Sequence, residues 1–503
     1  MTPMPIGPAS REGALKRRID RLMTAAIPFA IAMVVIPALP DVDLWGHVRF
    51  GGDIIHAGAI PTADPYSFTS DRSWVNHEWL TEITMYGAYA LAGPAGLTSL
   101  RLLLIASMLT LVVRTFADAG IRAPKLQLLV AFVAALTYTR TQHIRPQLYS
   151  LVLFAVLLYL INARERRPRA AWLVPLLMPL WVNLHGGWIV GLGTFGLWAG
   201  IEALQPTSNW RTRTELVVLV IAATVGTLIN PYGIGMWAFL WETVGLGRPD
   251  IEEWLPITHA LPGVVAFWCA TVAAAIWAVR VERPSSWSRL LLVVALGILS
   301  FRVVRLDAFF CLAVFMLLAP QFAKAFQPAA VRGELPLVAR AGLLSTIGIL
   351  CAIVLRWHSA TAIDLSNAKW LPEPDAIAYL RAHHVRGNML TYFDWGEYAI
   401  WHLSPDVRVS MDGRRETVYS DEGIDRHLAI YANGAGALDH VRQLRPDYIW
   451  LPKQLPVLSA LQAGGEWTVT YDGPRSAVLA RRPLAGRSGG ESRREQTRLF
   501  PGP

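Results

Sequence analysis

Apolar runs recur along most of this chain, and they restrict its fold more than any other feature does. After a first run at residues 22–40, they are centred at about 130, 155, 180, 195, 220, 270, 295, 315 and 345. A helix needs roughly 20 apolar residues to cross a bilayer, and several runs are shorter, so their ends must continue through more polar flanks. We expect an all-α polytopic membrane domain of about eleven transmembrane helices.

The composition agrees with this class of protein. Of the 503 residues, 53% are hydrophobic and only 17% are charged, whereas a soluble globular protein has roughly 25% charged residues. The net charge of +9 comes from basic residues in short loops, so we expect no nucleic-acid partner. The three cysteines, Cys269, Cys311 and Cys351, lie inside apolar runs, so we expect no disulfide or zinc framework.

The loops between the apolar runs are of two kinds. The mainly basic ones are the N-terminal arm at 1–22 and the loops near residues 123, 166, 211, 284 and 335. Because basic loops stay in the cytoplasm, and because counting runs from a cytoplasmic N-terminus puts all of these loops on one side, the other loops face out. We expect a transmembrane domain at 23–357, with a first outer loop at 41–85.

The apolar runs stop at about residue 370. Short strand patterns, "MLTYF", "VRVSM", "DYIWL", "WTVTY" and "AVLAR", then alternate with helical patterns such as "PDAIAYLRAHH" and "GALDHVRQL". This alternation is typical of a small α/β domain. We expect an extracytoplasmic α/β domain at 358–481, followed by a polar, disordered tail at 482–503.

Two amphipathic helices are expected on the membrane surface. One follows Asp43 and places Leu44, Val48 and Ile55 on its apolar side, and the other lies in "YGIGMWAFLWETVGL" with Trp237 at headgroup level. Apolar spacing of this kind next to tryptophan indicates helices that lie in the interface.

An aspartate pair, Asp41 and Asp43, directly follows the first apolar run. One carboxylate could serve as a general base, or both could hold a divalent cation, Mg or Mn, against a phosphate. The alternative is that one of them caps the interfacial helix, which requires a single side chain. His47 lies one helical turn after Asp43 and could pair with it, or could use its ring amphipathically at the interface. Arg49 belongs to the same stretch and is a further candidate contact.

The motif "WVNHEW" places an amide, an imidazole and a carboxylate between two tryptophans. Tryptophans alone fit an aromatic belt, but a belt does not need Asn76, His77 or Glu78. These three, together with Trp74, are candidate substrate contacts.

Basic residues also occur in the loops expected outside, at His143, Arg145, Arg302 and Arg305. Outer arginines oppose the positive-inside trend, so an anion such as a phosphate or diphosphate should hold them there. The alternatives are a lipid headgroup or an aspartate partner such as Asp307.

Two further motifs carry weaker indications. In "NLHGGW", which contains His185, the glycine pair lets the backbone approach a ligand closely or lets two helices touch. "YFDWGEY" and "SMDGRRE" each place an aspartate, Asp394 and Asp412, just after a strand, where α/β folds bind ligands. An Asp-Gly turn is the alternative for Asp412.

The opening loop, "DVDLWGHVRFGGDIIHAGAIPTADPYSFTSDRSWVNHEWL", resembles that of bacterial polytopic membrane proteins similar to GT-C glycosyltransferases, and "RPQ", "NPYG", "EW" and "DGR" also look like that group. The resemblance implies an enzyme of the bacterial inner membrane that transfers a sugar from a polyprenyl-phosphate donor to an acceptor on the outer side. It also implies that Asp41 and Asp43 supply the base or a metal contact.

This resemblance and the residues lead to one hypothesis. Asp43 is the base, and Asp41 supports it or a metal. Other side chains contact the donor or a lipid or glycan acceptor. Arg145, Arg302 and Arg305 bind the phosphate, His47 and His77 orient the donor or acceptor, and Trp45, Trp74 and Trp79 stack on sugar or lipid. Membrane lipids are further expected partners. Two alternatives stay open, a lipid or solute transporter and a non-catalytic assembly protein that binds a partner through its C-terminal domain.

Overall fold

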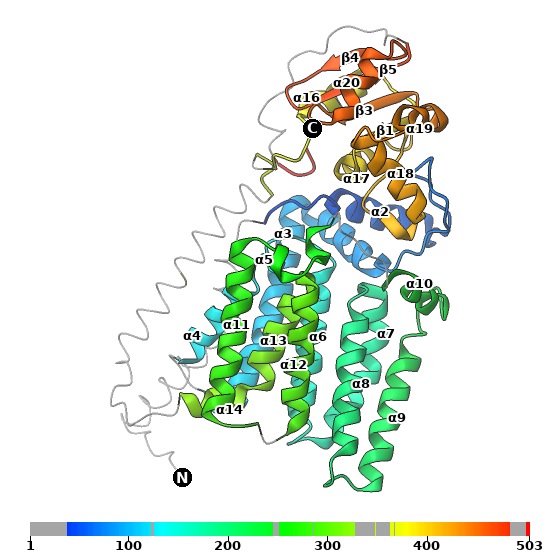
Figure 1. The fold of residues 1–503 in the computed structure, drawn as a ribbon. Helices are drawn as coiled ribbons and strands as arrows, with labels where there is room; N and C mark the ends of the chain where they lie inside the picture. Colours follow the sequence, from blue (N-terminus) through cyan, green and yellow to red (C-terminus); the bar gives the residue numbers. More distant parts are fainter. Residues whose placement is uncertain are drawn as a thin grey trace, which may run out of the picture.

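A computed structural model describes residues 38–121, 125–244, 251–284, 286–326, 348, 363–366, 368–482 and 499–502 (Figure 1). A bundle of long helices forms one part of the molecule, and a small α/β domain sits at one end of it. The expected first membrane helix and most of the run near residue 345 lie outside the described residues.

The bundle is built from helices of very different length. Its helices and the short ones that flank them are α2 (Leu44–Ala57), α3 (Trp79–Asp118), α4 (Lys125–Leu136), α5 (Tyr138–Thr141), α6 (Gln147–Ala163), α7 (Val174–Leu184), α8 (Trp188–Leu204), α9 (Trp210–Gly226), α10 (Gly235–Val244), α11 (Pro262–Val281), α12 (Trp287–Arg302), α13 (Asp307–Leu317) and α14 (Ala319–Ala325). Helix α3 is broken at Ala92 and Gly93, directly before Pro94, which cannot donate a helical hydrogen bond.

Few of the described helices are long and apolar enough to cross a bilayer. In the described part of the chain, α3 and α11 are long and apolar enough, and a third span arises if Val304–Leu317 and Ala319–Ala325, bent by 60°, count as one. Helices α6 and α8 are apolar but shorter. The chain is therefore an integral membrane protein, while the number of eleven spans stays a prediction.

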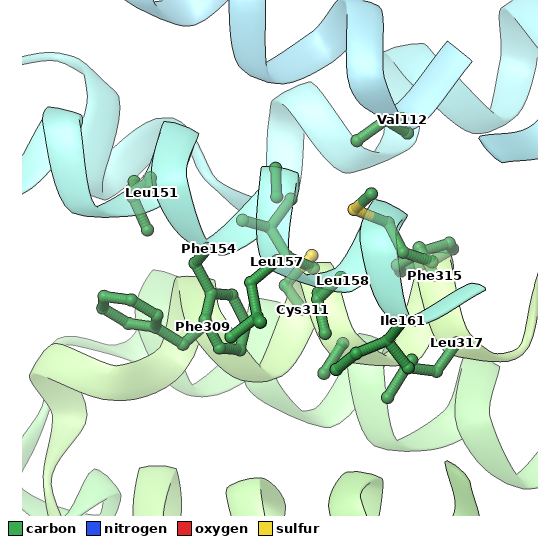
Figure 2. Close-up of a cluster of buried hydrophobic side chains, with 14 of the residues drawn as sticks. Val112, Leu151, Phe154, Leu157, Leu158, Ile161, Phe309, Cys311, Phe315 and Leu317 are labelled. Carbon is green, nitrogen blue, oxygen red and sulfur yellow. The ribbon is translucent and has the colours of Figure 1, made fainter. Parts of the chain in front are cut away.

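The centre of the bundle is a dry core in which α6 and α13 pack against α3 (Figure 2). Phe154 of α6 meets Phe309 of α13 edge to face, with ring centroids 5.0 Å apart. Both helices are buried on nearly every side, as expected of helices that are apolar all round. This core fixes the positions of α6 and α13 relative to each other, and their ends lie next to the α/β domain.

Helix α2, predicted as an interfacial helix, lies across the end of the bundle and contacts both α3 and the α/β domain (Figure 1). A Cβ on Gly51 would lie 2.0 Å from the carbonyl oxygen of Glu82, so only glycine allows α2 to approach α3 so closely. Trp45 is completely buried and packs against Tyr398 and Phe500. It cannot stack on a sugar, which corrects that expectation.

The α/β domain contains one five-stranded sheet in the order β2-β1-β3-β5-β4. Its strands are β1 (Gly387–Thr391), β2 (Val407–Val409), β3 (Tyr448–Pro452), β4 (Thr468–Asp472) and β5 (Ser476–Ala480), and all five were predicted. Strand β1 runs parallel to β2 and β3, whereas β5 runs antiparallel to β3 and β4. The helices are α16 (Pro374–Ala382), α17 (Gly396–Leu403), α18 (Asp421–Tyr431), α19 (Ala437–Leu444) and α20 (Pro456–Ala463).

The end of the chain departs from the expected disordered tail. Residues 499–502 pack against α2 and α17, where Phe500 is buried beside Trp45, Tyr89 and Trp401. The indole of Trp45 donates a hydrogen bond of 2.7 Å to the carbonyl oxygen of Pro501. An aromatic ring that fills a gap between two domains is ordered regardless of the polar residues before it.

Candidate active site

A cavity of about 860 Å³ lies where the bundle meets the α/β domain. Every segment that was expected on the outer side contributes to its wall, including α10 and the α/β domain. Its contributing residues include Asp43, His47, Asn76, His77, Glu78, Arg145, His185, Glu253, Arg305, Asp394 and Glu397. Segments that are far apart in the sequence therefore share one chemical environment.

Asp43 occupies the N-cap position of α2, but its side chain makes no capping hydrogen bond. Within the described residues, its carboxylate accepts no hydrogen bond and forms no ion pair, so the capping alternative does not explain it. Burial, and then the charge of Asp41, raise the pKa of Asp43 to about 7, although His47 and Arg145 oppose the shift. Such a carboxylate can accept a proton near neutral pH.

Asp41 has a different role from that of Asp43. Its Oδ1 accepts the backbone N–H of Asp43 at 3.1 Å, and its Oδ2 accepts the Nε–H of Arg145. The side chain of Asp41 is only 1% exposed and does not line the cavity. Asp41 therefore orients the backbone of Asp43 rather than facing a substrate.

Glu397, from the first turn of α17, approaches Asp43 from the α/β domain. Its Oε2 accepts the N–H of Gly46 in α2 at 3.0 Å. A Cβ on Gly413 would lie 2.0 Å from Oδ1 of Asp43 and 2.9 Å from Oε1 of Glu397. Burial, followed by the charge of Asp43, raises the pKa of Glu397 well above its usual value. The two carboxyl groups thus face one small gap that only glycine leaves open.

Replacing Gly413 with alanine should disable the site without unfolding the protein. The added methyl group must displace Asp43 or Glu397, and a shift of about 1 Å at a catalytic group can cost roughly 100-fold in rate. The matched control is Gly464→Ala, where the new Cβ would meet its nearest atoms at 3.5 and 3.6 Å. Transfer assays and thermal unfolding of both variants would test this; equal activity in the two would show that the gap is unimportant.

Two arginines at this end of the bundle, Arg145 in the cavity wall and Arg140 outside the cavity lining, are paired with carboxylates of the protein itself. Arg145 donates to Asp41 and, at 2.9 Å, to Oε1 of Glu253. Arg140 donates to the same Glu253 oxygen at 2.8 Å and to Asp307 at 2.9 Å. Burial would raise the pKa of Glu253, but Arg145, Arg305 and Arg140 outweigh it and lower that pKa to about 2. Internal anions therefore hold both of these arginines at this end of the bundle.

Arg305 differs from Arg140 and Arg145. Its guanidinium lies 5.7 Å from the ring centroid of Trp254. Its charge helps to lower the pKa of Glu253, but among the described residues no carboxylate oxygen lies within ion-pair distance of it. Asp307, which the sequence offered as a partner, is occupied by Arg140. Arg305 is thus a cation of the cavity that can accept a phosphate.

A cluster of histidines and carboxylates forms another part of the wall. Glu78 lies 3.5 Å from His77 and 3.6 Å from His185, measured between Nε2 and Oε1, and His47 faces Glu82 at 3.8 Å. Burial alone would lower the pKa of His47, but Glu82 and Glu78 outweigh it and raise it to about 9. His47 is therefore protonated at neutral pH and can contact an anion.

His185 is fixed as a neutral ring. Its Nδ1 accepts the N–H of Gly187 at 2.9 Å and lies 2.7 Å from the hydroxyl of Ser150. Burial lowers its pKa to about 3. The Nε2–H consequently points toward Glu78.

Several predicted contacts lie elsewhere. Arg49 pairs with Asp53 at 2.7 Å, His143 faces Asp41 at 3.7 Å, and Arg302 lines a separate apolar groove between α11 and α12, so none of the three lines the cavity. Trp74 touches the cavity but is only 2% exposed. The indole of Trp79 donates to Asn183.

Trp74 belongs to a buried junction around Arg414, which the sequence did not reveal. Arg414 donates to both carboxylate oxygens of Asp64 in the first outer loop, at 2.7 and 3.0 Å, and also binds Asp412. Its guanidinium lies 4.7 to 5.2 Å from the ring centroids of Trp74, Phe50 and Tyr66. The "DGR" motif, for which the sequence left open a ligand site or an Asp-Gly turn at Asp412, thus fastens the α/β domain to the bundle.

The described residues provide no complete set of protein ligands for the predicted Mg or Mn ion. Among the described residues, no group of three or more His, Cys, Asp or Glu side chains is placed to hold a metal ion. Asp41 already binds Arg145 and the backbone of Asp43. The divalent cation stays a prediction.

Solved structures show where this fold occurs. The chain is similar to ArnT from Cupriavidus metallidurans bound to undecaprenyl phosphate (TM-score 0.54, 13% identity, 92% of this chain and 98% of that one). It is also similar to the archaeal oligosaccharyltransferase AglB from Archaeoglobus fulgidus, in complex with an inhibitory peptide and a dolichol-phosphate (TM-score 0.53, 12% identity, 86% of this chain and 69% of that one). A third similar structure is the arabinofuranosyltransferase AftD from Mycobacteria (TM-score 0.53, 15% identity, 93% of this chain). The present chain spans only 40% of the length of AftD.

These similarities define the fold of the chain as that of the GT-C glycosyltransferases, which confirms the resemblance seen in the sequence. No protein-family model matches the sequence, and no curated protein matches it either. At 12 to 15% identity the likeness describes the fold and not the activity.

Proposed function

We propose that this protein is a membrane glycosyltransferase that moves a sugar from a polyprenyl-phosphate donor to an acceptor hydroxyl. The observation that carries the proposal is the unpaired carboxylate of Asp43, which shares a cavity with the cation Arg305 at the end of a membrane bundle. A base and a phosphate-binding cation are what this reaction requires. ArnT and AglB, which share the fold, were solved with undecaprenyl phosphate and a dolichol-phosphate.

The reaction would occur on the outer face of the bacterial inner membrane. By the positive-inside rule, the basic loops predict a cytoplasmic N-terminus and an α/β domain outside. The cavity supports this orientation, because its wall draws on every loop expected outside.

The chemistry needs a single displacement. The acceptor hydroxyl gives its proton to Asp43 while its oxygen forms a bond to the anomeric carbon of the donor sugar. The bond between that carbon and the phosphate oxygen breaks, and its electron pair leaves with polyprenyl phosphate. Arg305 and protonated His47 stabilise the departing phosphate, and Asp41 keeps Asp43 oriented.

The rate of transfer should rise with pH through about 7. Asp43 must be ionised to accept a proton, and its pKa is raised to about 7, so the rate falls on the acid side of that value. A pH profile of kcat/KM between pH 5 and 9 measures this. A rate that stays constant down to pH 5 would exclude Asp43 as the base.

The proposal is tested by offering a panel of radiolabelled polyprenyl-phosphate sugars to membranes that contain the wild-type protein, Asp43→Asn or no protein. Label incorporated into lipid or glycan only with the wild type supports the proposal. Equal incorporation in the wild type and in Asp43→Asn would reject the role of Asp43. Absence of incorporation from every donor would favour an assembly protein.

A further inference from the structure

The α/β domain presents its ligand-binding edge to the cavity. Strands β2, β1 and β3 are parallel, so their carboxyl ends meet at one edge of the sheet. The segments that follow these strands all line the cavity, at 392–394, at 411 and 413–417, and at 455–456. Open α/β sheets bind ligands at this edge.

This edge carries aromatic rings and polar groups together. Tyr392, Phe393 and Tyr431 line the cavity, and the rings of Tyr392 and Tyr431 lie 5.4 Å apart. The guanidinium of Arg415 lies 5.6 Å from the centroid of Phe393. Rings beside a few convergent polar groups are typical of a small-ligand site.

Asp394 is a side chain at this edge for which the described residues provide no partner. It lies directly after Phe393 in the cavity wall, and in the described part of the chain it makes no hydrogen bond or ion pair. A carboxylate only accepts hydrogen bonds, so Asp394 requires a partner with N–H or O–H groups.

The structure assigns this edge, through Phe393 and Asp394, as a binding site for a carbohydrate acceptor. The apolar face of a sugar ring packs on an aromatic side chain, and its hydroxyls donate to Asp394. The inference rests on the proposed function, because it names the acceptor class of the same cavity and places the acceptor on the α/β side and the donor phosphate beside Arg305.

Two other acceptor classes fit less well. A peptide commonly binds by pairing with the outermost strand of a sheet. The outermost strand near the cavity, β2, is already paired with the first outer loop: the N–H of Val409 donates to the carbonyl oxygen of Tyr66 at 2.9 Å, and the N–H of Phe68 donates to that of Val409 at 3.1 Å. An anionic lipid headgroup would be repelled by the carboxylate of Asp394, and Arg305, the cation proposed to bind phosphate, belongs to the bundle wall.

Binding tests this inference without any need for transfer. Purified full-length protein in lipid nanodiscs is applied, without donor, to an array of lipid-free envelope oligosaccharides, an array of peptides, and vesicles of phosphatidylglycerol. We expect saturable binding to a subset of the oligosaccharides, weakened at least about tenfold by Phe393→Ala and by the isosteric Asp394→Asn. Glu422→Gln, on the exposed side of α18, is the matched control.

The outcomes separate this inference from the proposed function. Oligosaccharide binding that both variants weaken supports the acceptor site at Phe393 and Asp394, even if no sugar transfer is ever detected. Binding to peptides or to vesicles alone would overturn it in favour of that acceptor class. Binding to none of the three, or oligosaccharide binding that neither variant changes, would overturn it as well, even if label transfer had established the enzyme.

Discussion

Replacing Asp43 with asparagine is expected to lower kcat for sugar transfer by roughly 100-fold to 10,000-fold, the usual contribution of a general base. Asparagine keeps the shape of the side chain but cannot accept the proton of the acceptor hydroxyl. The KM for the donor should change little, because Arg305 and His47 bind the phosphate. Steady-state kinetics on purified protein in nanodiscs measures both parameters.

The stability of this variant should move in the opposite direction to its activity. The pKa of Asp43 is raised in the folded protein, so above pH 7 its ionised form is disfavoured there relative to the unfolded chain. A neutral asparagine removes that cost, and the unfolding midpoint should be unchanged or higher at pH 8. Asp439→Asn on the exposed side of α19 is the control. An inactive variant that is also clearly less stable would point to a structural role.

Replacing Arg414 with alanine is expected to be the most destabilising single change at the domain junction. Arg414 is buried and holds Asp64 and Asp412, whose side chains are completely inaccessible. Removing one partner of a buried ion pair leaves uncompensated charge and costs about 3–5 kcal/mol. Thermal or denaturant unfolding in detergent should show this loss, and transfer should fall because Gly413 and Glu397 lose their position against Asp43.

Two comparisons make this prediction specific. Arg442→Ala removes a guanidinium that pairs with Glu466 and Asp439 on the surface, and it should change the midpoint little. Arg414→Lys restores the charge but not the forked geometry, so its stability should lie between those of the alanine variant and the wild type. If Arg414→Ala were as stable as Arg442→Ala, Arg414 would not be what holds the two domains together.

The parts of the fold that depend on local pattern could be predicted from the sequence. Alternating apolar residues gave all five strands of the α/β domain, and amphipathic spacing gave α2 and α10. Sorting basic loops from other loops also predicted which segments would share one end of the bundle, and these segments meet in one cavity. Motifs in these outer segments predicted eight residues that line the cavity: Asp43, His47, Asn76, His77, Glu78, Arg145, His185 and Arg305. Arg49, His143 and Arg302 were predicted as well and do not line it.

The contacts that build the site were out of reach because they join distant residues. Arg414 and Asp64 are 350 positions apart, and Gly46 and Glu397 are 351 apart. Nothing in local spacing pairs them. The outer arginines illustrate the same limit, since the expected external anion is replaced at Arg145 by Asp41 and Glu253.

The most direct test of the central claim is a stoichiometric measurement on purified protein reconstituted with an accepted donor and acceptor. For every sugar transferred, one molecule of free polyprenyl phosphate should appear, with the wild type but not with Asp43→Asn. Release of polyprenyl phosphate without a glycosylated acceptor, or equal product from both proteins, would contradict the account.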